Sequence, residues 1–258
     1  MIDSHCHLYF DTYDGRREEA VRDAVDAGVH TIVNIGIDLE SSKKCIELAE
    51  RFDGLYATVG YHPHDAARAP KDYIDRLRDL AAHPKVVAIG EIGLDFYRDL
   101  SPRPVQHQVF EQQLELASEL SKPIVIHTRE SFEPTLEVVR RYADSLAGGV
   151  FHCFPGDAND ADRVIALGFV ISVGGVITYK KASMARTAAE TPLEKIIIET
   201  DAPFLTPVPY RGKTNYPAYV RYTCEKLAEL HGVSVSEAER VTDRTCRKLY
   251  GLVETFGD

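Results

Sequence analysis

Ile2-Asp3-Ser4-His5-Cys6-His7-Leu8 stands almost at the start of the chain, and the fold can be worked out from it. The stretch is predicted to form a short β-strand. Because side chains alternate between the two faces of a strand, His5 and His7 point the same way and Cys6 points the other way. Two imidazoles on one face can bind a single divalent cation. Alone, such a pair is more often an ordinary pair of surface or core histidines, so the metal interpretation needs ligand-type residues at other strand ends.

The composition is that of a globular protein of the cytoplasm. The 258 residues suit one large domain or two small ones, and 44% of them are hydrophobic, enough for a substantial core. No apolar run is long enough to span a membrane, and the start of the chain does not resemble a signal peptide. The five cysteines include no Cys-x-x-Cys pair, which favours reduced thiols over disulfides. We therefore expect a cytoplasmic location and no membrane partner.

The charge of the chain limits how it can hold a polyanion. The formal net charge is -10 at pH 7, which argues against a broad basic surface for nucleic acid. A polyanionic substrate would have to be bound locally, by metal ions and a few well-placed Arg or Lys side chains.

Short apolar runs alternate with stretches of helical periodicity along the whole chain. The predicted strands are residues 2–8, 31–36, 55–60, 86–90, 124–126, 149–151, 169–173 and 196–198. The predicted helices are residues 16–28, 41–51, 73–82, 105–120, 134–143, 157–168 with Asp157 as N-cap, 180–190, 217–231 and 236–250. Almost wholly apolar strands indicate a sheet that is buried on both faces.

The alternation of strands and helices predicts an α/β fold with parallel strand pairing. Eight such units close most naturally into a (β/α)8 TIM barrel with helices outside. A doubly wound open sheet is the alternative, but no Gly-x-Gly-x-x-Gly follows any predicted strand. No repeat, low-complexity tract or linker divides the chain, so residues 1–258 are predicted to form a single domain.

Polar residues of the metal-ligating types follow several of the predicted strands. They are His5, His7, His62, His64, Glu91, His127, His152 and Asp201. In a closed barrel the carboxyl ends of the strands meet at one face, where active sites are built. Burying these groups together without partners would cost much free energy, whereas divalent cations would satisfy them. The sequence therefore predicts a metal site at this end of the barrel.

Two metal ions explain the number of candidate ligands better than one. Four histidines and two carboxylates are more than a single open catalytic ion takes. Glu91 can offer one oxygen to each ion, and is assigned to both. The first ion is assigned His5, His7 and Asp201, and the second is assigned His127 and His152. Paired ions suit hydrolysis by an in-line water, and Asp201 is either a ligand only or also the general base.

Five segments together resemble the TatD family of metal-dependent deoxyribonucleases, which belongs to the amidohydrolase-like superfamily. They are Asp3-Ser4-His5-Cys6-His7, Gly90-Glu91-Ile92-Gly93-Leu94-Asp95, His127-Thr128-Arg129-Glu130, Phe151-His152-Cys153-Phe154 and Glu199-Thr200-Asp201-Ala202-Pro203. The resemblance covers essentially the whole chain and matches His5, His7, Glu91, His127, His152 and Asp201 to the family's metal ligands. It implies a barrel, two divalent ions and hydrolysis of nucleic-acid phosphodiesters, often from the 3′ end of single-stranded DNA or RNA.

The bridging residue separates this family from others in the superfamily. Many relatives that cleave amides or lactones bridge their metals with a carbamylated lysine, whereas here the strand carries Glu91. Lys85 lies at the opposite end of that strand. A glutamate bridge therefore resembles the nuclease branch. Mixed histidine and carboxylate ligands admit Mg, Mn or Zn.

Substrate contacts are predicted from the residues that surround the expected ligands. Arg129, two residues after His127, and Arg211 and Lys213, in the loop after the last strand, could hold phosphate, although each could equally be a solvated charge. His64 could donate to a phosphate oxygen or be a satisfied loop histidine. The aromatic residues Phe96, Tyr97, Phe204 and Tyr210 could stack a base, with packing under loops the commoner role. Asp95, Glu130 and Glu199 are expected to orient ligands or loops.

Three classes of function are consistent with these residues. The first is a nuclease or phosphodiesterase, with DNA and possibly RNA as partner. The second is a hydrolase of another ester, such as the aminoacyl link on transfer RNA. The third is a metal-binding protein without enzymatic activity, which is disfavoured because two ions sharing these ligands keep positions open for water and substrate. Fold alone does not separate the first two.

Overall fold

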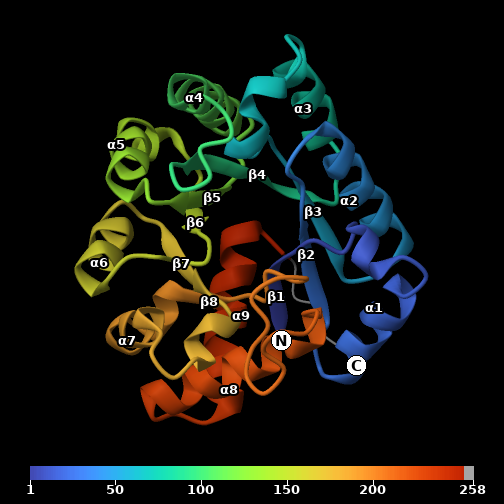
Figure 1. Ribbon diagram of the computed structural model, residues 1–258, viewed down its shortest axis with the longest axis vertical. Helices are drawn as coiled ribbons and strands as arrows, with labels where there is room; N and C mark the ends of the chain where they lie inside the picture. The colour runs from blue at the N-terminus through green and yellow to red at the C-terminus, as the bar shows by residue number, and fades with distance from the viewer. Residues whose placement is uncertain (253–258) are drawn as a thin grey trace.

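The computed structural model describes residues 1–252 and shows a parallel eight-stranded barrel surrounded by helices (Figure 1). The last six residues of the predicted domain, 253–258, lie outside the described part. Each strand pairs in parallel with the next in chain order. The strands are β1 (Ile2–Cys6), β2 (Thr31–Ile35), β3 (Leu55–Val59), β4 (Val86–Asp95), β5 (Ile124–Arg129), β6 (Gly149–Phe151), β7 (Val170–Val173) and β8 (Ile196–Ile198). The predicted TIM barrel is therefore confirmed.

The ring closes between β1 and the segment that follows β8. Cys6 bridges Ala202 in parallel, and the His7 amide donates to the Ala202 carbonyl over 2.8 Å. The Asp201 amide in turn donates to the His5 carbonyl over 2.9 Å. These bonds fix His5, His7 and Asp201 side by side, although almost the whole chain separates them in sequence.

Helices cover the outside of the barrel, as the alternating pattern predicts (Figure 1). They are α1 (Arg17–Asp26), α2 (Leu39–Arg51), α3 (Tyr73–Ala81), α4 (Arg103–Glu119), α5 (Phe132–Tyr142), α6 (Ala158–Ala166), α7 (Ser183–Glu190), α8 (Val220–His231) and α9 (Val235–Tyr250). Asp157 caps α6 as predicted, because its side chain accepts from the Asp160 amide. Among the described residues, no helix is both long and apolar enough to cross a membrane.

Two apolar clusters hold the barrel together. Inside the ring, strand residues such as Val33, Val125 and Ile197 pack with Tyr250, the last residue of α9, and with Leu252. Outside the ring, the other faces of the strands pack against the helices in a larger cluster. Both faces of the strands are therefore buried, which explains their continuous apolar runs.

β4 is longer than predicted, and its glycines explain why. The sequence predicts a strand that ends at Gly90, whereas pairing with β5 continues to Asp95. Between Ile89 and Ile92 the register slips, so β4 contains a bulge. A Cβ at Gly90 would lie 2.6 Å from the Val125 side chain, and one at Gly93 would lie 2.0 Å from the His127 carbonyl oxygen. Only glycine permits this approach, and the bulge carries Glu91 into the barrel mouth.

Candidate metal centre

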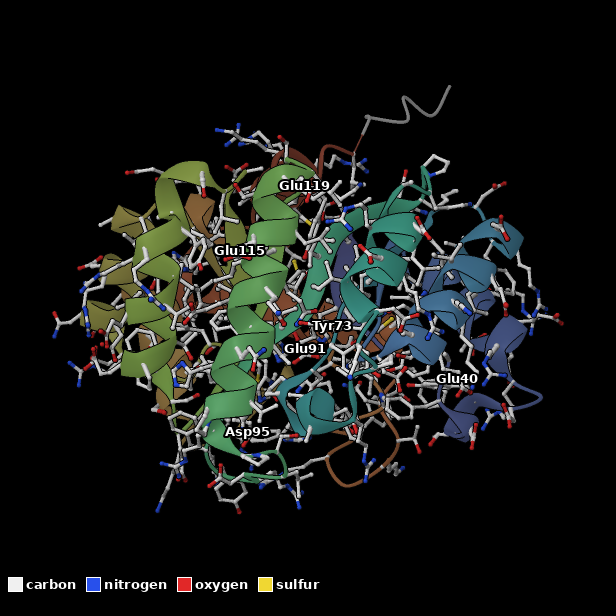
Figure 2. The ribbon with its side chains drawn as sticks, turned by 90° about the horizontal axis from the view of Figure 1, so that it is seen from above. Glu40, Tyr73, Glu91, Asp95, Glu115 and Glu119 are labelled. Atoms are coloured by element: carbon white, nitrogen blue, oxygen red, sulfur yellow. The ribbon has the colours of Figure 1, made fainter. Side chains whose placement is uncertain are left out.

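Six predicted ligands converge at the carboxyl end of the barrel. They lie in β1, β4 and β5 or follow β1, β6 and β8, and are His5, His7, Glu91, His127, His152 and Asp201. Figure 2 shows Glu91 near the middle of the molecule and Asp95, further along β4, nearer the end of the barrel at the bottom of the view. The barrel thus brings together residues from five places in the sequence.

Glu91 occupies the middle of the cluster. Its Oε1 lies 2.9 Å from His127 Nδ1 and 3.0 Å from His152 Nε2. Its other oxygen, Oε2, lies 3.6 Å from His5 Nε2. One carboxylate therefore faces two groups of histidines, with one oxygen directed to each. That is the arrangement expected of a carboxylate shared by two cations.

Asp201 completes the group around His5 and His7. Its Oδ1 lies 3.6 Å from His5 Nε2 and 3.4 Å from His7 Nε2, and the two histidine nitrogens are 3.3 Å apart. The strand ends at Cys6 rather than at Leu8, but both rings still face the centre. Alternation in β1 therefore gave the correct direction for both side chains.

Acceptors behind the histidines orient three of the rings. His7 Nδ1 donates to the Ile35 carbonyl oxygen over 3.0 Å. His127 Nε2 lies 3.0 Å from Asp95 Oδ2, and His152 Nδ1 lies 3.4 Å from Glu199 Oε1. The His7 and His127 rings therefore have a proton held on the outer nitrogen, and their other nitrogen faces the centre. His152 Nδ1 makes an ion-pair contact with Glu199 but has no hydrogen-bond partner among residues 1–252. Second partners of this kind accompany metal-ligating histidines, and Asp95 and Glu199 occupy the positions expected of orienting residues.

Charges in the cluster shift the pKa values strongly. Burial by itself would raise the pKa of Glu91, but the neighbouring His152 and His62 outweigh it and hold that pKa well below its usual range. Burial would lower the pKa of His152, but Glu91 and Glu199 raise it well above the ordinary value. Burial and the neighbouring His127 lower the pKa of His62 well below that of a free imidazole. Carboxylates therefore stay ionised at this centre.

The donors fit a divalent cation. His5 Nδ1 is buried and has no hydrogen-bond partner among residues 1–252, while His5 Nε2 points at two carboxylates and at His7 Nε2. Imidazole nitrogens and carboxylate oxygens together are ligands that Zn²⁺ and Mn²⁺ accept readily, and Mg²⁺ accepts the carboxylates. The convergence of lone pairs in a buried place thus fits bound metal.

A cavity of about 610 Å³ opens directly above the cluster. Its wall includes the exposed cations Arg98 and Arg129 and the apolar side chains Val176 and Met184. Phe10 and Phe204 pack edge to face on one side of it, 5.7 Å between ring centroids, and Phe204 is 50% exposed. A space of this size can hold a small ligand or one unit of a larger one.

The predicted substrate-binding residues lie in different surroundings. Arg129 lines the cavity, with its guanidinium carbon 4.0 Å from the Tyr97 ring centroid. His64 also lines the cavity, but its Nε2 is 2.8 Å from Asp95 Oδ2. Arg211 and Lys213 lie outside the lining and pack on Tyr179 and Tyr210. Arg129 is therefore the nearest of the three predicted cations to the metal cluster.

Three residues that line the cavity were given no role as ligand or substrate contact by the sequence. His62 was counted among the ligand-type residues that follow strands, and its spacing from His64 equals that of His5 from His7, but it was assigned to neither ion. Phe10 and Arg98 lie in loops after β1 and β4, where no motif distinguishes them from other loop residues. Loop positions depend on the path of the backbone rather than on local pattern.

Comparison with known proteins gives consistent matches over nearly the full chain. Residues 2–251 match the family described as TatD related DNase. The uncharacterized metal-dependent hydrolase YabD of Bacillus subtilis is 38% identical over 253 residues, covering 98% of this chain and 99% of that protein. The 3′-5′ ssDNA/RNA exonuclease TatD of Cronobacter sakazakii is 32% identical over 256 residues, covering 97% of each. The crystal structure of YJJV, a TatD homologue from Escherichia coli K12, superposes with a TM-score of 0.92 at 31% identity, covering 98% of each chain.

Proposed function

This chain belongs to the TatD family of metal-dependent hydrolases, and on that premise we propose that it hydrolyses phosphodiester bonds of nucleic acid. The preferred substrate is the 3′ end of single-stranded DNA, with RNA as a second substrate. The observation that carries the proposal is the position of Glu91, whose two oxygens face two separate groups of histidines. Paired metal sites of this kind suit in-line displacement at phosphorus.

These distances support an assignment of ligands to two divalent ions. His5, His7 and Asp201 would hold one ion, His127 and His152 would hold the other, and Glu91 would be shared. When bound, the ions would supply the positive charge that stabilises phosphate oxygens and makes water nucleophilic at neutral pH. Asp201, whose pKa the neighbouring His7 and His5 lower against the effect of burial, would orient the attacking water and accept its proton.

The size and lining of the cavity favour the end of a single strand of nucleic acid over a duplex as substrate. Its volume of about 610 Å³ suits a nucleotide-sized group. The half-exposed ring of Phe204 beside Phe10 offers a surface for a base. Arg129 and Arg98 on the rim would neutralise neighbouring phosphates. With a net charge of -10, the rest of the surface contributes little attraction.

The test compares substrates and metals in one experiment. A 5′-labelled single-stranded oligonucleotide, its duplex, a matching RNA and an aminoacylated transfer RNA are incubated with protein that has been stripped of metal and then reloaded with Mg, Mn or Zn. We expect metal-dependent, stepwise loss of nucleotides from the single-stranded oligonucleotide. Release of the amino acid from transfer RNA without shortening of any strand would overturn the proposal in favour of an ester hydrolase of another kind.

A matched pair of variants controls for contamination and for folding. Glu91→Gln removes the shared carboxylate, and should abolish both turnover and the binding of a full complement of metal. Glu40→Gln makes the same change on α2, where the side chain is 78% exposed and forms an ion pair with Lys44. It should leave turnover unchanged. Equal activity in the two variants would show that the measured nuclease activity does not come from this metal centre.

A further inference from the structure

His62 lies at the metal cluster and invites assignment as one more ligand. It follows β3, is 7% exposed and begins the 3-10 turn Pro63–Arg68. Its Nε2 is 3.6 Å from Glu91 Oε1, and its ring packs against His127 with centroids 4.4 Å apart. His62, His64 and His127 also place ring nitrogens within 4.8 Å of one another. Proximity alone would therefore make His62 a ligand.

The hydrogen bond at the other side of the ring argues otherwise. The backbone amide of His64 donates to His62 Nδ1 over 3.1 Å. A backbone amide can only donate, so Nδ1 must carry the lone pair. In the neutral ring the proton is then on Nε2, and that nitrogen has no lone pair for a cation. The nitrogen that faces the centre is thus an N–H group.

His7 shows the opposite arrangement at the same centre. Its Nδ1 lies 3.0 Å from the Ile35 carbonyl oxygen, which can only accept. The His7 ring is therefore protonated on Nδ1 and directs the lone pair of Nε2 at the cluster. The two histidines differ in which nitrogen carries the proton, and only His7 is suited to bind metal through Nε2.

The local backbone fixes the tautomer of His62. The His62 amide donates to the Ile37 carbonyl over 2.9 Å, and its carbonyl accepts from the Asp65 amide over 3.0 Å. Both backbone groups of His62 are therefore hydrogen-bonded. The turn that follows His62 directs the amide of His64 at the His62 ring. Ligation through Nδ1 would break that bond and leave the amide unpaired. The turn, rather than a chance contact, sets the position of the proton.

The proton on Nε2 is not used within the protein. The distance of 3.6 Å to Glu91 Oε1 exceeds that of a hydrogen bond, and among residues 1–252 Nε2 forms no hydrogen bond. His62 also lines the cavity above the cluster. An acceptor atom that enters the cavity beside Glu91 can therefore take this N–H bond without displacing anything.

We infer that His62 is a neutral hydrogen-bond donor to a phosphate oxygen of the substrate, and not a metal ligand. The inference rests on the proposed hydrolysis of phosphodiesters. No proton is transferred: the Nε2–H group is shared with an oxygen whose negative charge increases as the phosphorus is attacked. A donor already in place for that charge stabilises the transition state more than the ground state. His62 is then a catalytic residue that touches the substrate.

Nuclear magnetic resonance tests the tautomer without reference to activity. Protein labelled with ¹⁵N-histidine is recorded metal-free and loaded with Zn or Mg, and His62→Gln assigns the signals by their disappearance. We expect an unprotonated Nδ1 and a protonated Nε2 for His62 in both states. Loss of the Nε2 proton, or a metal-bound shift of either nitrogen on loading, would overturn the inference.

Variants then separate a donor from a ligand. His62→Leu removes the donor, while His62→Gln keeps an N–H group near the place of Nε2. Bound metal per chain should equal that of the wild type in both, whereas His7→Gln should lose metal. On the single-stranded oligonucleotide, kcat should fall about a hundredfold in His62→Leu, the scale for one lost donor, and recover in large part in His62→Gln. Metal lost from both His62 variants would make His62 a ligand.

Inorganic phosphate provides a readout that survives failure of the proposed function. Its affinity for the metal-loaded protein, measured by calorimetry, should be weaker in His62→Leu than in the wild type and restored in His62→Gln. If no nuclease activity is found, the tautomer, the metal content and the phosphate affinity still decide the role of His62. Unchanged phosphate affinity in the folded His62→Leu variant would show that His62 does not donate to phosphate.

Discussion

Two pairs of histidines with the same spacing lie at one centre but differ in their hydrogen-bond partners. His5 lies near the end of β1 and His7 follows it, and their Nε2 atoms approach to 3.3 Å beside Glu91 and Asp201. In the second pair, after β3, the rings of His62 and His64 meet edge to face with centroids 4.3 Å apart. His7 in the first pair presents a lone pair to the centre, and His62 in the second pair presents an N–H group.

The difference comes from the backbone that carries each pair. β1 lies beside β2, so a carbonyl group of β2, that of Ile35, meets the outer nitrogen of His7. The second pair opens a 3-10 turn, so an amide meets the outer nitrogen of His62, and Asp95 meets the Nε2 of His64. A His-x-His spacing thus tells which way the rings point. The partner of the second nitrogen decides whether a ring binds metal.

The largest expected effect separates a ligand in the first pair from a histidine in the second. His7→Ala should remove most of one metal equivalent and lower kcat more than a thousandfold, beyond the roughly 10–100-fold typical of groups behind the ligands. His64→Ala, which removes the contact with Asp95 and the ring contacts with His62 and His127, should keep its metal, and kcat should fall about tenfold or less. Metal analysis and steady-state kinetics on both variants check this. Equal loss of metal from His7→Ala and His64→Ala would contradict the assignment of His7 as a ligand and His64 as a non-ligand.

Asp201 tests the first pair through its carboxylate. Asp201→Asn should lower kcat about a hundredfold or more, the scale of a lost general base, while the protein stays folded. The reason is that Asp201 Oδ1 lies 3.4 Å from His7 Nε2 and 3.6 Å from His5 Nε2, where a water must be oriented. Kinetics at saturating metal, with circular dichroism for the fold, measures it. Near-normal kcat would leave Asp201 without a role in catalysis.

Asp95 connects the second pair to the cluster. One oxygen, Oδ2, contacts both His64 Nε2 at 2.8 Å and His127 Nε2 at 3.0 Å. Asp95→Asn should therefore weaken metal binding or activity by about 10–100-fold. Titration of metal-free protein with Zn measures the affinity. Asp75→Asn, on the exposed face of α3, is the control and should bind metal as the wild type does.

Binding of single-stranded nucleic acid should depend on few charges around the two pairs. Three phosphate contacts predict a log–log salt slope no steeper than about -3, at roughly -0.7 per contact. Arg129→Ala, at the cavity, should lower affinity more than Arg211→Ala, which lies outside the lining. Both losses should be independent of base sequence, because phosphate contacts carry no base information. Fluorescence anisotropy across salt concentrations measures the slope, and a steeper one would reveal a larger basic surface.

The smallest expected effect concerns pH in metal-free protein. Burial and His127 lower the pKa of His62, so its ring should stay neutral while histidines of the unfolded chain take up protons near about pH 6.5. A lowered pKa means that the folded state binds fewer protons than the unfolded state. The contribution of His62 therefore reduces stability as pH falls below that value. Chemical shifts of His62 that move through a full titration between about pH 7 and 6 would contradict the assignment.

The sequence was sufficient for the architecture and for the gathering of the ligands. Apolar runs alternating with helical periodicity specify parallel pairing, because a strand buried on both faces cannot alternate polar and apolar residues. The carboxyl ends of parallel strands share one face, so His127 and His152, from β5 and β6, had to meet there with Glu91. The motif around Glu91 also predicted a ligand at this position, and the glycines beside it permit the bulge that carries Glu91.

The tertiary structure alone decided which nitrogen of each ring faces the centre and which cations reach the cavity. The proton of His62 is set by the amide of a turn, and that of His7 by a carbonyl of a neighbouring strand. Arg211 is directed onto Tyr179 by the course of its loop, while Arg98 reaches the cavity wall without a motif. Periodicity records which side of a strand or helix is buried. It does not record hydrogen-bond partners from other segments, because these depend on how the elements meet.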